Sequence, residues 1–273
     1  MPLSRGVGSR LRLARLTVLI ALLVATVSWA GYEIRSRRAR REWQRPLEVA
    51  VALVQLGAID PSALVALRAR FPALETRLNE EYHRYGGRLP RPVNFTLFGP
   101  VTVDRAPPPD PDTTLLSLAQ HAYEQWRWTH AVDVGTNLPA RAFDSRIYVL
   151  MTAPRDRTRS LVEGSSEFGG RVGVARIELG ASTVDLALFV VTHELFHTLG
   201  ANDKYDENGR TSIPDGLVEP ERVPRYPQRY AEVMTRNLVI AAGSERLPDS
   251  LAELGVGALT AREIGWSGSE PPK

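Results

Sequence analysis

Two histidines and a glutamate stand at a spacing that a helix converts into a metal site. The segment from His193 to His197 reads HELFH, and Gly200 and Asp203 follow it to complete the pattern HExxHxxGxxD. Residues four apart on a helix are separated by about 40° around its axis, so both imidazoles project from one face. Both can therefore bind one zinc ion, with Glu194 placed to hold and deprotonate a water molecule. The chemistry indicated is hydrolysis.

The surrounding sequence indicates that this helix is largely buried. The run from Asp185 to Leu199 is strongly apolar, and buried histidines need partners. Gly200 can end the helix in a left-handed conformation that turns the chain back toward the metal. Asp203 is then the favoured third ligand and Asp206 the alternative, which leaves the fourth position for water, as in a catalytic zinc site.

The pattern resembles that of the metzincin zinc peptidases, which is HExxHxxGxxH/D. Its aspartate form is similar to that of the snapalysin-type small bacterial neutral proteases. The resemblance implies that His193, His197 and Asp203 bind one catalytic zinc ion and that Glu194 is the general base of peptide-bond hydrolysis. Gly200 would support the site by ending the helix.

Metzincins also carry a methionine turn, an apolar floor beneath the zinc. Met234 lies 31 residues after Asp203 and is the candidate for that turn. Some members place a tyrosine two residues after the methionine, but this chain has Arg236 there. Tyr205 and Tyr230 are close in sequence, and neither occupies that position.

The resemblance covers residues 113–266 and implies an α+β domain with a mixed sheet, an active-site helix and a small C-terminal subdomain. Residues 146–152 and 173–179 predict strands. The second would be an edge strand that holds an extended peptide substrate by β-augmentation. Residues 259–266 predict a short last helix. Residues 113–132 predict an amphipathic helix whose apolar stripe consists of Leu115, Leu118, Ala119, Ala122, Tyr123 and Trp126.

Residues 1–46 predict a membrane anchor with basic flanks. An apolar run extends from Leu16 to about Tyr32, near the lower length limit of a transmembrane helix, between two arginine-rich stretches. A cleaved signal peptide is the alternative, but the length of the run and Trp29 in the small-residue region favour an uncleaved single-pass helix. Arginines on both flanks leave the positive-inside rule undecided. A large hydrolase after a short tail favours an extracytoplasmic domain.

The charge distribution and the cysteine content limit the kinds of partner and metal ligand that the chain can use. The net charge is +3, but residues 1–46 hold ten arginines and two glutamates, so the remainder carries −5. A mildly acidic soluble part does not favour nucleic-acid binding. Without cysteine the chain has neither disulfides nor thiolate ligands. Only Lys204 and Lys273 are lysines among its 34 basic residues, which we interpret as a composition bias.

Residues 47–112 are interpreted as an accessory region that ends in a proline-rich linker. It could be a stalk, a small accessory domain or a segment that covers the cleft. Helical patterns are predicted at 46–56 and 61–85, and two strands at 93–98 and 101–104. Residues 113–273 would then be the zinc-peptidase-like domain.

The sequence therefore predicts a membrane-anchored zinc endopeptidase that acts on peptide or protein substrates. Two alternatives stay open. One is a membrane-tethered binding module whose metal site is structural, and the other is a metal-dependent amidase for a non-peptide amide. The oligomeric state is not indicated.

Overall fold

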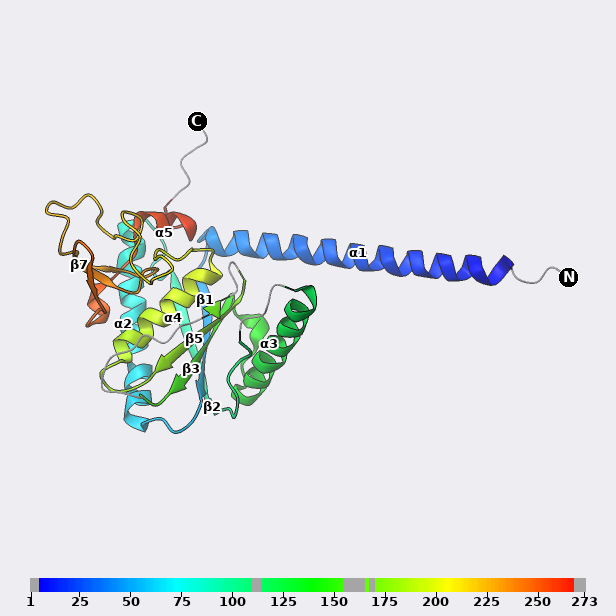
Figure 1. Cartoon of the computed structure of the whole chain (residues 1–273), viewed down its shortest axis with the longest axis horizontal. Coiled ribbons are helices and arrows are strands. Elements are labelled where there is room, and N and C mark those ends of the chain that lie inside the picture. Colours follow the sequence, from blue (N-terminus) through cyan, green and yellow to red (C-terminus); the bar gives the residue numbers. More distant parts are fainter. Residues whose placement is uncertain (1–4, 110–113, 155–164, 167–169, 268–273) are drawn as a thin grey trace, which may run out of the picture. The chain divides into compact units, whose positions relative to one another are not determined.

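A computed structural model of the chain describes residues 5–109, 114–154, 165–166 and 170–267 (Figure 1). It has two compact units, Met1–Glu42 and Trp43–Lys273. The first is the helix α1 (Arg5–Arg41), which is long and apolar enough to span a membrane from Ala14 to Arg41. Its side chains from 14 to 28 are exposed, unlike those of a soluble core helix.

The second unit is built on one mixed, mainly parallel sheet with the strand order β2-β1-β3-β5-β4. Its four parallel strands are β1 (Leu47–Gln55), β2 (Val93–Thr102), β3 (Ser145–Thr152) and β5 (Val172–Glu178). The two-residue strand β4 (Ser165–Ser166) runs antiparallel to β5. The fold is thus a mixed α/β arrangement with a parallel sheet.

Helices cover both faces of this sheet (Figure 1). The helices α2 (Pro61–Arg84) and α4 (Val184–Thr198) pack on one face, and α3 (Leu115–Thr136) packs on the other. Alternate residues of β1 point to opposite faces of the sheet and pack in two different hydrophobic cores. Val49, Val51 and Leu53 pack in the first, while Ala50, Ala52 and Val54 pack in the second.

Short elements after α4 form the C-terminal part. Strands β6 (Ala231–Glu232) and β9 (Leu254–Gly255) pair in parallel, while β7 (Leu238–Ala241) and β8 (Ser244–Arg246) form a hairpin. The short 3-10 helices η1 (Ala140–Ala142) and η2 (Leu251–Glu253) are connectors. The predicted last helix is present as α5 (Ala258–Glu263).

Residues 47–112 form part of the main domain, contrary to the prediction from the sequence. They are not an accessory region, because β1, α2 and β2 belong to the same sheet and core as the metal-site helix. The predicted helix at 46–56 is wrong, because residues 47–55 form the strand β1. A parallel strand buried on both faces is a continuous apolar run, which lacks the polar alternation that would have identified it. The proline-rich linker lies partly outside the described residues.

Three further expectations need correction. The compact unit begins at Trp43 rather than at residue 47, because the Trp43 indole packs on Tyr82 and Trp266. The strand β5 is not outermost, since β4 pairs with its residues 173–174. The predicted stripe of α3 is largely exposed, and the helix instead buries Thr129, Val132, Asp133 and Thr136.

Candidate metal centre

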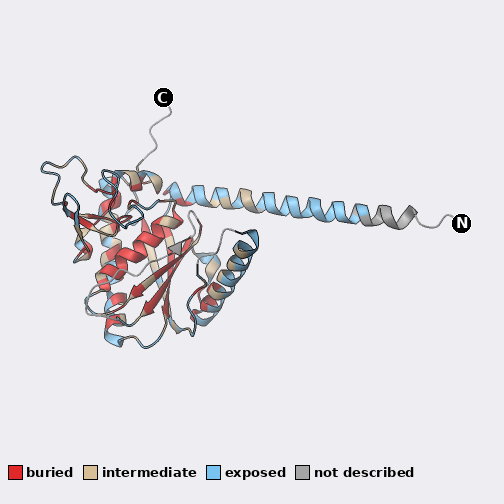
Figure 2. Cartoon of the chain, in the orientation of Figure 1, coloured by how far each residue is buried: buried red, intermediate tan, exposed pale blue. Residues whose placement is uncertain are grey.

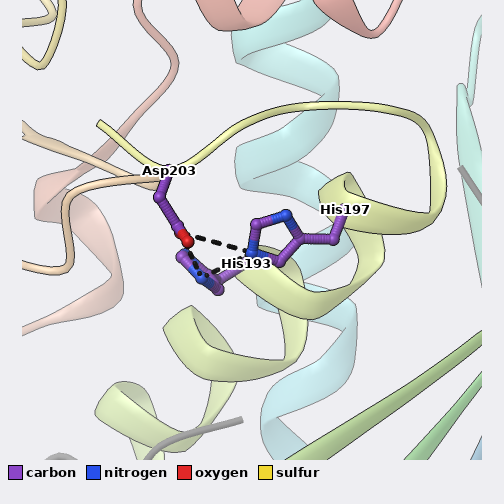
Figure 3. A group of neighbouring side chains, drawn as sticks. All are labelled: His193, His197 and Asp203. Atoms are coloured by element: carbon purple, nitrogen blue, oxygen red, sulfur yellow. Dashed lines mark hydrogen bonds and ion pairs between the residues drawn. The ribbon is translucent and has the colours of Figure 1, made fainter. Parts of the chain in front are cut away.

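The helix α4 brings the two histidines of the HExxH pattern together. It is buried along almost its whole length (Figure 2). The Nε2 atoms of His193 and His197 lie 3.0 Å apart. Asp203 Oδ1 lies 3.2 Å from the first and 3.3 Å from the second, so the three side chains point at one another (Figure 3). Within the described residues they form one group that could hold a metal ion.

Backbone hydrogen bonds fix which imidazole nitrogen faces this group. His193 Nδ1 lies 3.0 Å from the carbonyl oxygen of Val233, and His197 Nδ1 lies 2.9 Å from that of Ala201. A carbonyl oxygen can only accept, so each Nδ1 carries a proton and donates it. In the neutral imidazoles each Nε2 then presents a lone pair to the other and to Asp203. Such a convergence of acceptors is the environment of a cation, and these second hydrogen bonds orient ligands in metal sites.

The spacing of the three atoms fits a tetrahedral zinc site. With ligand bonds of about 2.0–2.2 Å, ligand atoms in a tetrahedral site lie about 3.3–3.6 Å apart. The three separations here are 3.0, 3.2 and 3.3 Å, so a small movement outward would accommodate the ion. Two imidazoles and one carboxylate are a donor set that zinc accepts.

Gly200 delivers Asp203 to this position. Its φ of +94° is left-handed, and its N–H donates to the carbonyl of His197 as α4 ends. No atom lies within 4 Å of the Cβ that a larger residue would add there, so backbone conformation is what requires glycine. Asp206 is not in the group. Its exposed carboxylate accepts the N–H groups of Asn208 and Arg210 within its own turn.

The charges of the group are coupled. Burial alone would raise the pKa of Asp203, but hydrogen bonds from His193 and His197 hold it far below its ordinary value. Burial likewise opposes the charged form of His197, yet the Asp203 carboxylate and the nearby Glu194 raise the pKa of His197. A proton on His197 would thus place beside Asp203 the positive charge that a bound metal ion would otherwise supply.

Glu194 is buried beside the two histidines, with an exposed fraction of 1%. The strand β5 approaches it closely at Gly173, where an added Cβ would lie 3.3 Å from both Cβ and the carbonyl oxygen of Glu194. The absence of a side chain at 173 therefore lets the sheet pack directly against the candidate base.

The predicted methionine turn lies against His193. Met234 is fully buried, and Val233 before it accepts the His193 hydrogen bond. The buried Glu232 accepts the Met234 N–H at 2.5 Å and the Gly257 N–H at 3.2 Å through separate oxygens. This carboxylate ties the turn to the segment that leads into α5.

Tyr205 and Arg236 also lie beside the histidines. The Tyr205 ring stacks on His193 with centroids 6.4 Å apart, and its hydroxyl accepts a hydrogen bond from Arg236 at 2.5 Å. The guanidinium lies 4.6 Å from the centre of that ring. Burial is the main cause that raises the pKa of Tyr205 to about 12, so the phenol keeps its proton at neutral pH. The sequence pattern alone does not place Tyr205 at the site, whereas the structure brings its ring against His193.

Comparison with known proteins finds similarity at the level of structure. No protein-family model matches the chain, and no curated protein matches its sequence. Among solved structures, it is similar to the crystal structure of archaemetzincin from Methanopyrus kandleri, at 16% sequence identity and a TM-score of 0.31. The match covers 60% of this chain and 78% of the archaemetzincin chain.

Proposed function

We propose that this chain is a zinc-dependent peptidase anchored to a membrane by α1. The observation that carries the proposal is the convergence of His193 Nε2, His197 Nε2 and Asp203 Oδ1, with both Nδ1 atoms already bonded to backbone carbonyls. A structural zinc site usually has four protein ligands, whereas a catalytic one has three. The described residues supply three, which favours the enzyme over the binding module.

The chain's own residues would divide the work of amide hydrolysis. Zinc, when bound, would polarise the scissile carbonyl and lower the pKa of a water molecule to about 7. Glu194 would accept the proton of the attacking water and pass it to the nitrogen of the leaving amine. Its burial keeps the residue out of bulk water, where a preorganised base is most effective.

Tyr205 and Arg236 would stabilise the negative charge that develops on the carbonyl oxygen. The Tyr205 hydroxyl accepts from Arg236 and is hydrogen-bonded to the Asp203 carboxylate, so its proton would have to turn from that carboxylate to the carbonyl oxygen of the substrate. A phenol polarised by a guanidinium is a stronger donor than a phenol alone. Tyr205 and Arg236 come from two different loops. Tyr205 would thus provide the hydroxyl that some metzincins have at the position of Arg236.

The test compares the full chain, purified in detergent with zinc, with its Glu194→Gln and Asp203→Ala variants on a peptide library. We expect cleavage by the wild type. Glu194→Gln should keep one zinc per chain and lose turnover by roughly 100-fold or more, because an amide cannot take the proton. Asp203→Ala should lose the metal, and an Asp206→Ala variant should keep it.

Each alternative function predicts a different result. Zinc binding with no cleavage of any peptide would favour the binding module, while hydrolysis of only non-peptide amides would favour the amidase. Full activity of Glu194→Gln would refute the assigned role of that glutamate. Protease accessibility of the domain in sealed vesicles would establish on which side of the membrane it lies, which we propose to be the extracytoplasmic side.

A further inference from the structure

The third ligand of the candidate site differs from the other two in how it is held. His193 and His197 stand on a buried helix, and each ring is also tied by its own hydrogen bond. Asp203 stands on the segment after α4, which has no regular secondary structure, and its side chain is 40% exposed. Its carboxylate is hydrogen-bonded to His193, His197 and Tyr205, and the position of its backbone depends on the residues on either side of it.

Both neighbours of Asp203 are bound to one carboxylate, that of Glu263 at the end of α5. The Asn202 N–H and side-chain amide donate to the two oxygens of Glu263, at 3.2 and 3.0 Å. The Lys204 ammonium donates to Glu263 Oε2 at 2.7 Å. One residue that lies 60 positions further along the chain thus joins the peptide units before and after the ligand.

Lys204 also makes hydrogen bonds of its own to the backbone around Asp203. Its ammonium also donates to the carbonyl of Asn202 at 2.9 Å, and its backbone N–H donates to the carbonyl of Met234 at 3.0 Å. Lys204 is 4% exposed. In a chain whose other basic residues, apart from Lys273, are all arginine, this position has a lysine. A compact ammonium with three donors fits between two close acceptors where a planar guanidinium does not.

We propose that Glu263 and Lys204 are positioning residues that set the metal affinity of the site by clamping the backbone on both sides of Asp203. The inference rests on the proposed zinc site and adds to it a dependence on α5. Without the clamp, the 202–204 segment would sample many conformations. Binding of the ion would then have to supply the ordering free energy that the folded chain now supplies in advance.

The expected effect is on zinc affinity rather than on the chemical step. Loss of outer-shell partners of metal ligands typically weakens metal binding by about 10–100-fold. We expect this range for Glu263→Gln, because the amide loses the negative charge that pairs with Lys204 and the second oxygen that accepts the Asn202 side-chain amide. Lys204→Met should fall in the same range, because it removes the ammonium at similar length. At saturating zinc, kcat should stay near the wild-type value.

The experiment measures the zinc dissociation constant of the full chain in detergent by competition with a chromophoric chelator. The melting temperature of each metal-free form is recorded alongside. Glu253→Gln is the matched control, since Glu253 also binds a cation, Arg246 at 2.6 Å, and a backbone N–H, that of Asp249 at 2.7 Å. The short helix that contains Glu253 contacts α4 near its start, where the Leu251 N–H donates to Asp185. Asp185 lies more than two helical turns before His193, so this control does not touch the metal ligands.

Weaker zinc binding by Glu263→Gln and Lys204→Met, with wild-type affinity in Glu253→Gln, would support the clamp. Wild-type affinity in Glu263→Gln, even with a lowered melting temperature, would make its role purely structural and would overturn the inference while leaving the proposed function intact. Should Glu263→Gln fail to fold, Lys204→Met decides the question alone by the same criterion. A wild-type chain that binds no zinc would overturn the proposed function and the clamp together.

Discussion

Glu232 should make the folded protein less stable as the pH rises from acid to neutral. Its carboxyl is 1% exposed, and burial raises its pKa from 4.5 to about 7, although hydrogen bonds and the Lys204 charge oppose the shift. Between these two values the folded chain keeps a proton that the unfolded chain has lost. Because the folded state then binds more protons, the free energy of unfolding falls with increasing pH.

The size of the effect follows from the shift. Each pKa unit corresponds to about 1.4 kcal/mol, so this group alone should lower the free energy of unfolding by about 3 kcal/mol across the window. The contribution is fully present below pH 4.5 and is lost as the pH passes through about 7. Such a loss is a substantial part of the 5–15 kcal/mol that typically stabilises a folded domain.

The assay is urea denaturation of the metal-free protein at a series of pH values from 4.5 to 8, for the wild type and for Glu232→Gln. The variant cannot ionise, so the difference between the two proteins isolates the group from all other titrations. A constant cost is expected in the variant, because one amide oxygen cannot accept the N–H groups of both Met234 and Gly257. The prediction concerns the slope and not this offset.

An exposed carboxylate provides the control for Glu232. The Glu80 side chain is 58% exposed, and Glu80→Gln should leave the pH dependence of the wild type unchanged. If the wild type and Glu232→Gln have parallel stability curves over this range, Glu232 does not change its protonation there. The reasoning from burial would then be refuted.

Two substitutions near the candidate base follow from close contacts. Gly173→Ala would place a methyl group 2.9 Å from Ile147 Cδ1 and 3.3 Å from Glu194 Cβ. We expect lower peptide turnover at unchanged zinc content and a stability loss of about 1–3 kcal/mol by urea denaturation. Full turnover would show that the neighbouring side chains simply move aside. Tyr205→Phe removes the hydroxyl that is bonded to Arg236. We expect kcat to fall on the order of 100-fold with little change in KM. A kcat within twofold of the wild type would exclude contact between this hydroxyl and the reacting oxygen.

The parts of the site that sequence reasoning reached are those encoded locally. His193 and His197 share a face because four residues advance a helix by slightly more than one turn. Gly200 ends that helix for a reason that concerns its own backbone, and Asp203 follows three residues later. The structure brings these ligand candidates together as expected. Their roles toward a metal remain predictions for the assays above.

The parts that sequence reasoning did not reach depend on residues far apart in the chain. The carbonyl that orients His193 belongs to Val233, 40 positions away. Every residue type has a backbone carbonyl, so the sequence does not indicate which one will accept this hydrogen bond. The strand β1 was interpreted as a helix because its apolar residues face two cores at once. Both assignments required knowledge of which segments pack together, and periodicity within one segment does not contain it.

The order in which the chain is synthesised gives the position of Glu263 a further meaning. Translation releases the HExxH helix well before α5, and the Asn202–Lys204 segment has its clamp only when residue 263 has emerged. A nascent or C-terminally trimmed chain would carry all three metal ligands and yet hold zinc weakly. At limiting zinc, a chain that lacks residue 263 would therefore be mostly empty of metal, and metal loading would report that the domain is complete.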